Sequence, residues 1–241
     1  MPRRRRGWLE QSCYHVTHRC HGSEFRFRFR KYREFYVREL YQASRRFGMD
    51  VLDYMVTSNH VHLLLASREG PEISAGLGYL HGRMGQWHNG QRGASGSFWG
   101  DRFHATRIQS GAHLGRCLFY IDLNMVRAGV VEHPREWVHC AYHELVGQRR
   151  RYRIVNRRRL LACLMMGDEE QFRDWYQKTL AEKLRRRELA REAHWSRALA
   201  VGDADWLRSV AGDFGLRRVS VAEADECHYL VGKTAGGTPN A

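Results

Sequence analysis

The sequence predicts an α+β fold, a sandwich in which helices cover a central antiparallel sheet. Strand-like runs meet at a hairpin around residues 57–60, and segments with helical spacing separate the other strands. This alternation is typical of sheets that carry helices on their faces. The chain has 241 residues, of which 43% are hydrophobic, and this is enough for a sizeable core.

Three strands and one helix are expected in the first part of the chain. Residues 12–21 alternate in the manner of a strand. Residues 31–48 have the spacing of an amphipathic helix, which ends at Gly48. Residues 51–57 and 60–66 then predict two strands around a short Ser-Asn turn.

A second helix and a further strand follow. Residues 72–89 place apolar side chains at helical intervals and predict an amphipathic helix. A Gly- and Ser-rich loop leads to residues 97–108, which predict a strand, and residues 111–129 predict another helix.

The character of the sequence changes near residue 149. Residues 149–159 carry seven arginines and open a charged region with helical spacing. We therefore predict three parts: a basic N-terminal arm over residues 1–11, a domain over residues 12–148, and an arginine-rich, mainly helical C-terminal extension over residues 149–241.

The composition indicates the class of partner. Forty Lys and Arg against 26 Asp and Glu leave a net charge of +14, so nucleic acid is the expected partner. The alternative is that the arginines only form a well-solvated surface. No run is long enough for a transmembrane helix, and no signal peptide is expected at the N-terminus, so we expect a cytoplasmic protein with no membrane partner. Six cysteines without CxxC pairing fit a reducing compartment and argue against a zinc ribbon.

Two histidines in the strand over residues 60–66 are candidate metal ligands. Side chains two positions apart on a strand point to the same face, so His60 and His62 can bind one cation together. The alternative is that one is an ordinary core histidine and the other is incidental. A metal site also needs a third ligand from elsewhere in the fold.

The helix over residues 111–129 has a polar face that is unusual for a solvated surface. This face carries His113, Arg116, Tyr120, Asn124 and Arg127 at steps of three or four residues. The carbonyl oxygen of Asn124 can complete the metal site, and Tyr120 can reach a phosphate. The alternative for Tyr120 is a half-buried packing role.

Three segments of the chain together resemble motifs of the HUH superfamily of single-strand DNA nucleases. The segments SNHVHLLL, FWGDRF and YIDLNMVRAG are similar to those of the single-tyrosine transposases, most of all the REP-associated tyrosine transposases, and the resemblance covers about residues 12–147. It implies a ferredoxin-like sandwich and a divalent metal, Mg or Mn, held by His60, His62 and Asn124. It also implies that Tyr120 is the nucleophile and forms a 5′-phosphotyrosine.

Two positions depart from the family pattern and affect the third ligand. The family usually has proline where this chain has Ser58 and Met125. Proline fixes the backbone and lacks an N–H, so the presentation of Asn124 can differ here. His104 and Gln109 are the alternatives for the third ligand.

The expected DNA partner is a hairpin with a single-stranded flank, as the resemblance implies for REP-like palindromes. The candidate DNA-binding residues are Trp99, Arg102, Arg116, Arg127 and the tetra-arginine run Arg3, Arg4, Arg5 and Arg6. Aromatics interleaved with arginine in residues 26–36 suit base stacking, or they are core residues of the following helix. One HxH motif and one tyrosine in the same chain predict a monomer, with a dimer left open.

Two other functions compete with DNA cleavage and rejoining. The first is a non-catalytic DNA hairpin binder or repressor that is derived from such a transposase. The second is an unrelated metal hydrolase, although the chain lacks an HExxH or HxHxDH run.

Overall fold

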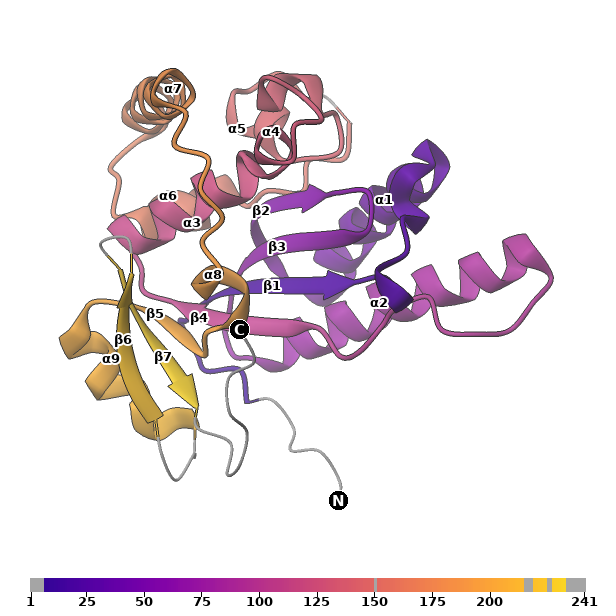
Figure 1. The fold of residues 1–241 in the computed structure, drawn as a ribbon, viewed down its shortest axis with the longest axis horizontal. Coiled ribbons are helices and arrows are strands. Elements are labelled where there is room, and N and C mark those ends of the chain that lie inside the picture. Colours follow the sequence, from indigo (N-terminus) through magenta and orange to yellow (C-terminus); the bar gives the residue numbers. More distant parts are fainter. Residues whose placement is uncertain (1–6, 150, 215–218, 225–226, 233–241) are drawn as a thin grey trace.

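Four strands and two helices of the N-terminal half form a ferredoxin-like βαββαβ unit in the computed structural model, which describes residues 7–149, 151–214, 219–224 and 227–232 (Figure 1). Its elements are β1 (Cys13–Arg19), α1 (Arg30–Phe47), β2 (Asp50–Val56), β3 (His60–Ala66), α2 (Pro71–Arg92) and β4 (His104–Ile108). The strands are ordered β2-β3-β1-β4, and every neighbouring pair in this unit is antiparallel. The predicted α+β sandwich with a central antiparallel sheet is therefore confirmed for this unit.

The ends of the two helices follow the local sequence. Gly48 ends α1 with φ of 66°, a left-handed conformation that glycine adopts without the strain of a Cβ atom. Pro71 begins α2, and the Glu72 carboxylate accepts hydrogen bonds from the backbone N–H groups of Arg68 and Gly70, each at 2.7 Å. The predicted helices over residues 31–48 and 72–89 are thus confirmed.

The predicted strand over residues 97–108 is shorter than expected. Only β4 pairs with β1, while residues 98–103 cross the end of the sheet and touch it through one bridge between Cys20 and Trp99. Phe98 and Trp99 are buried there against aromatic rings from other elements. Their burial, rather than strand pairing, explains the apolar character of this segment.

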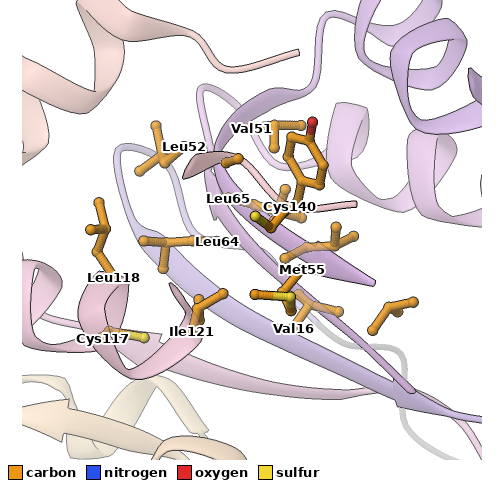
Figure 2. Close-up of a cluster of buried hydrophobic side chains, with 14 of the residues drawn as sticks. Val16, Val51, Leu52, Met55, Leu64, Leu65, Cys117, Leu118, Ile121 and Cys140 are labelled. Carbon is orange, nitrogen blue, oxygen red and sulfur yellow. The ribbon is translucent and has the colours of Figure 1, made fainter. Parts of the chain in front are cut away.

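The predicted helix over residues 111–129 is divided in two. It consists of α3 (Ala112–Asp122) and α4 (Asn124–Arg127), separated at Leu123, where ψ is 3°. In Figure 1, α3 lies on the side of the sheet opposite α1 and α2. Its apolar side chains pack on the sheet, and Figure 2 shows Leu118 and Ile121 directed toward Leu64 of β3.

The C-terminal part adds further helices and also three strands. Its helices and strands are α5 (Tyr142–Leu145), α6 (Arg157–Leu164), α7 (Glu169–Arg186), α8 (His194–Arg197), β5 (Ala200–Gly202), α9 (Ala204–Val210), β6 (Val219–Ala224) and β7 (Cys227–Gly232). Short 3-10 helices are η1 (His21–Ser23), η2 (Arg26–Arg28), η3 (Pro134–Glu136) and η4 (Ala211–Phe214).

The three C-terminal strands continue the N-terminal sheet. β5 pairs in parallel with β4, and the order β2-β3-β1-β4-β5-β7-β6 makes one mixed seven-stranded sheet. The sequence predicted a mainly helical extension because its charged runs with helical spacing are long. It did not predict these strands, of which β5 has only three residues. No helix among the described residues is long and apolar enough to cross a lipid bilayer. All six cysteines are buried.

Candidate active site

A cleft of about 910 Å³ opens where β1, β3, α3, α4 and the segment around α8 meet. It contains the predicted residues His60, His62, Tyr120 and Asn124, together with Arg102 and Arg127. It also contains Arg191, Ser196 and Arg197 from the C-terminal part of the chain. The structure therefore gathers most of the predicted site in one cavity and adds residues more than 60 positions away in the sequence.

Two imidazoles and one amide converge inside this cleft. The Nε2 atoms of His60 and His62 are 2.8 Å apart, and the Nδ2 atom of Asn124 lies 3.1 Å from Nε2 of His62. His60 and His62 point to the same face because they are two positions apart on β3. Asn124 reaches them because it begins α4 directly after the break at Leu123.

The protonation of His62 is fixed by a buried chain of hydrogen bonds. The Nδ1 atom of His15 lies 2.7 Å from the carbonyl oxygen of Trp195, which can only accept, so His15 carries its proton on Nδ1. Burial lowers the pKa of His15 to about 4, so the ring is neutral and its Nε2 is an acceptor. Nε2 of His15 lies 2.8 Å from Nδ1 of His62, which must therefore be the protonated nitrogen of that ring. The lone pair on Nε2 of His62 then faces the cleft.

The tautomer of His60 is fixed in the same way from the other side. Asn59 donates its Nδ2 to the carbonyl oxygen of Ser23, which turns its Oδ1 toward Nδ1 of His60 at 2.7 Å. Nδ1 of His60 is therefore protonated, and its Nε2 presents a lone pair. Burial lowers the pKa of His60 to about 3 and that of His62 well below its usual value, and positive charge nearby, on Arg19 for His60 and on His60 for His62, lowers each pKa further.

The Nε2 lone pairs of the two neutral rings thus face each other, with the nitrogens 2.8 Å apart. The lone pairs repel each other, and a cation bound between them would remove this repulsion. Within the described ranges, no group of three His, Cys, Asp or Glu side chains is placed to hold a metal ion. A third protein ligand would therefore be the Asn124 amide, whose oxygen takes the place of Nδ2 when the group turns by half a rotation. The donor set of this cleft fits a divalent cation.

The two alternative third ligands are placed differently. Gln109 lies outside the cleft, where its side chain hydrogen-bonds to Asp203 at 3.0 Å through Nε2 and at 2.6 Å through Oε1. His104 lines the cleft, but its Nε2 is 2.9 Å from the carbonyl oxygen of Ala198. Asn124 is the one of the three that lies beside His62.

The phenol of Tyr120 shares the cleft with the two histidines. Its ring centroid is 6.1 Å from that of His62, and the side chain is 7% exposed. Burial raises the pKa of Tyr120, and the nearby guanidinium of Arg127, centred 4.4 Å from the ring, only partly opposes this effect. The effect of burial is the larger one, so the phenol is protonated at neutral pH.

The predicted polar face of the helix does not stay together. Arg116 lies away from the cleft and its Nη1 is 3.3 Å from Sγ of Cys227, while His113 is 2.9 Å from a carboxylate oxygen of Asp203. Arg127 does line the cleft and donates to the carbonyl oxygens of Tyr120 and Ala190. Arg116 instead lines a second cavity, which it shares with Tyr120 and Arg127.

The other candidate DNA-binding residues are placed as follows. Arg102 is exposed at the rim of the cleft. Trp99 is 8% exposed and packs on His18 with a centroid distance of 4.1 Å, so its burial does not fit the expected stacking on DNA bases. Arg3, Arg4, Arg5 and Arg6 lie outside the described residues.

The arginine run over residues 149–159 makes contacts within the protein. Arg149 donates to the hydroxyl of Tyr54 at 2.6 Å, and Arg159 donates to the carbonyl oxygen of Ser67 at 3.2 Å. Arg157 pairs with Glu169. Arg149 and Arg159 therefore tie the start of the C-terminal part to the ferredoxin-like unit, whereas Arg157 makes its ion pair within the C-terminal part.

Sequence reasoning missed the residues that support the two histidines. His15 lies in the segment over residues 12–21, which was predicted as a strand. It points to the same face of that strand as Thr17, which lines the cleft. No local pattern marks Trp195, Ser196, Arg191 or Arg197 as neighbours of residue 62, because their placement depends on the path of the whole C-terminal segment.

Comparisons with known proteins identify a family and two similar solved structures. Residues 9–124 match the family model described as "Transposase IS200 like", a range that includes His60, His62 and Tyr120 and ends at Asn124. No curated protein matches the chain. A solved structure of a REP-associated tyrosine transposase bound to a REP hairpin is similar with a TM-score of 0.52 and 17% identity, covering 61% of this chain and 87% of that one. A putative transposase from Deinococcus radiodurans R1 has a TM-score of 0.32 and 20% identity, covering 43% of this chain and 83% of that one.

Proposed function

We propose that this chain, which belongs through residues 9–124 to the family of IS200-like transposases, cleaves and rejoins single-stranded DNA next to hairpins. Enzymes of this family are generally endonucleases. The observation that carries the proposal is the common cleft, in which the Tyr120 phenol lies beside the convergent nitrogens of His60, His62 and Asn124. A packing role alone does not explain why Tyr120 lines the same cleft as the two facing lone pairs of His60 and His62.

His60, His62 and Asn124 are the residues that would hold a divalent metal, Mg or Mn. When bound, such an ion offsets the negative charge of a scissile phosphate and aligns it. His15, Asn59 and Thr57 orient the two imidazoles through their Nδ1 atoms, so the side chains that face the metal are arranged before it binds.

Tyr120 supplies the nucleophile. Its hydroxyl oxygen attacks the scissile phosphorus and its proton passes to solvent water, while the P–O bond to the 3′ oxygen breaks and that oxygen takes up a proton from solvent water. The products are a 5′-phosphotyrosine and a free 3′-hydroxyl. A 3′-hydroxyl can then attack the phosphotyrosine, which restores the DNA bond and the free phenol without ATP.

Cations around the cleft bind the DNA backbone. Arg19, Arg102, Arg191 and Arg197 are exposed and line the cavity, and Arg127 covers the face of the Tyr120 ring. Guanidinium groups bind phosphate oxygens in pairs of hydrogen bonds and therefore hold a strand in register. The net charge of +14 supports the same partner.

A hairpin with a single-stranded flank is the proposed substrate. The similar transposase was solved bound to a REP hairpin, which supports this choice for a chain with the same fold. One chain supplies both the tyrosine and the histidines of the cleft, so the active form is proposed to be a monomer.

The test is an incubation of 5′- and 3′-labelled hairpin DNA, carrying a single-stranded flank, with protein and Mn²⁺. A covalent protein–DNA band on a denaturing gel, absent from the Tyr120→Phe variant, is the expected result. Free fragments without a covalent band would support a hydrolase instead. Uncut DNA that still binds would support the non-catalytic hairpin binder or repressor.

A further inference from the structure

Two phenylalanine rings stand in solvent beside the active cleft. Phe25 is 60% exposed and Phe29 is 50% exposed, and no other phenylalanine among the described residues belongs to the exposed class. Both flank η2, in a segment where the sequence left base stacking and core packing as alternatives. Phe27 between them is fully buried, so the structure divides the segment between both roles.

The backbone that carries these rings is rigidly held. Phe27 packs against Tyr36 and Phe98 at centroid distances of 5.6 and 5.2 Å. Arg33 donates from one nitrogen to the carbonyl oxygens of Phe27 and Arg28, at 2.6 and 2.9 Å. The exposed rings are therefore displayed by an ordered turn, and a ligand that contacts them does not need to order the loop first.

A slot lies between the two rings. It has a volume of about 470 Å³ and is lined by Phe25, Phe29, Tyr32, His88, Glu24 and the arginines Arg26, Arg28 and Arg92. The single carboxylate of the slot, Glu24, is already paired with Arg26 at 2.9 Å. Arg28 and Arg92 are exposed, and the guanidinium of Arg28 lies over one face of the Phe29 ring at 4.7 Å from its centroid, so the slot combines flat apolar surface with positive charge.

The slot adjoins the active cleft along the chain. Gly22 and Ser23 line the cleft and Glu24 lines the slot. The carbonyl oxygen of Ser23 also accepts the hydrogen bond that orients Asn59 and, through it, His60. A strand that leaves the cleft along this loop would therefore meet the two rings next.

We infer that Phe25 and Phe29 form a stacking platform for unpaired bases of the single-stranded flank, with Arg28 and Arg92 on the phosphates of the same nucleotides. Exposed aromatic rings next to cations are the combination that binds single-stranded nucleic acid without sequence preference, because every base has a flat face. The inference rests on the proposed function for the identity of the strand.

The experiment measures DNA binding without chemistry, in the Tyr120→Phe background. Three fluorescent ligands are compared by anisotropy: a hairpin with a single-stranded flank, the same hairpin without a flank, and an oligothymidine strand. Phe25→Ala and Phe29→Ala should each weaken binding of the flanked hairpin and of oligothymidine by roughly tenfold, within the range of stacking losses for one base. Binding of the flankless hairpin should stay the same.

Matched variants separate base stacking from general apolar contact. Phe25→Tyr and Phe29→Tyr keep an aromatic face and should retain affinity, whereas Phe25→Leu and Phe29→Leu keep apolar area only and should lose it. Val130→Ala, at another side chain that is 52% exposed, should change nothing. Because all these side chains are exposed, the thermal midpoints should agree, which a melting scan checks.

The possible results distinguish this platform from the proposed function. If the leucine variants bind the flank as well as the wild type does, or if the alanine variants alter self-association in sedimentation and not DNA affinity, the platform is refuted and the surface serves a protein contact. A wild type that forms no covalent adduct, but whose oligothymidine binding still depends on both rings, would refute the cleavage proposal and leave the platform standing.

Discussion

Replacement of His15 by phenylalanine should weaken metal binding, although His15 itself is not a proposed ligand. His15 accepts the Nδ1 proton of His62 and donates its own Nδ1 proton to the Trp195 carbonyl oxygen, at 2.8 and 2.7 Å. Without that acceptor, His62 is free to move its proton to Nε2, where it would block the lone pair that faces the cleft. Loss of such a supporting contact typically weakens metal affinity by about 10- to 100-fold. This corresponds to roughly 1.4–2.7 kcal/mol.

The same change should also lower the free energy of unfolding. It leaves two buried groups without partners, the His62 N–H and the Trp195 carbonyl, and each unsatisfied group costs about 1–3 kcal/mol. His15 is 0% exposed, so water does not replace the lost contacts. Mn²⁺ calorimetry gives the affinity, urea unfolding gives the stability, and nitrogen NMR shifts report which nitrogen of His62 is protonated.

Two control variants make this test specific. In His15→Gln, the side-chain oxygen can accept from His62, so Mn²⁺ affinity should largely return while the Trp195 contact stays lost. His81→Phe removes another buried histidine, on α2, and should cost stability without altering Mn²⁺ affinity. Equal Mn²⁺ affinity in His15→Phe and the wild type, with the His62 proton still on Nδ1, would refute the role of the hydrogen-bond chain.

Four further predictions follow from the same structure. Tyr120→Phe should abolish the covalent adduct and leave hairpin affinity within about twofold on a filter-binding assay, because only a hydroxyl is lost. His60→Ala or His62→Ala should eliminate Mn²⁺ binding and cleavage while the melting curve shows a folded protein, and full cleavage in either variant would make the pair structural. Flanked hairpin should bind better than a linear strand or a perfect duplex of equal length, with an affinity that falls steeply as salt rises, and equal or salt-independent constants would contradict this. Burial and the neighbouring charge of Asp122 raise the pKa of Asp53 well above its ordinary value, so the contribution of Asp53 to stability is fully present below about pH 4 and declines as pH rises toward the folded-state pKa. Asp53→Asn should remove this component, so the difference in unfolding free energy between wild type and variant should change with pH in urea unfolding; a pH-independent difference would contradict it.

Much of the fold was predictable because its signals are local. The strand pattern around His60 and the helix that stops at Gly48 both follow from spacing and from the conformational freedom of glycine. The strand over residues 97–108 was overextended because Phe98 and Trp99 have strand-like side chains but are buried against rings from η2 and α1. Burial by tertiary contact and burial in a sheet look the same in a sequence.

The proposed metal ligands and the proposed nucleophile of the candidate site were predictable from the sequence. His60 and His62 share a strand face, and Asn124 lies four residues after Tyr120, so their spacing identified them. Trp195 contributes a backbone carbonyl, which any residue type possesses, and therefore no residue pattern can reveal it. The exposure of Phe25 and Phe29 was equally invisible, because Phe27 in the same run is buried.

The C-terminal part is therefore in direct contact with the candidate active site and is not a separate extension. Trp195 is fully buried, and its carbonyl oxygen is the fixed end of the hydrogen-bond chain that reaches His62. Arg191 and Ser196 lie in the same cleft as Tyr120. Since β5 pairs with β4 immediately after this segment, the sheet itself holds it over the cleft. Under the proposed function, residues 9–124 therefore supply the reacting groups, and the segment after α7 fixes the orientation of His62 through the carbonyl oxygen of Trp195.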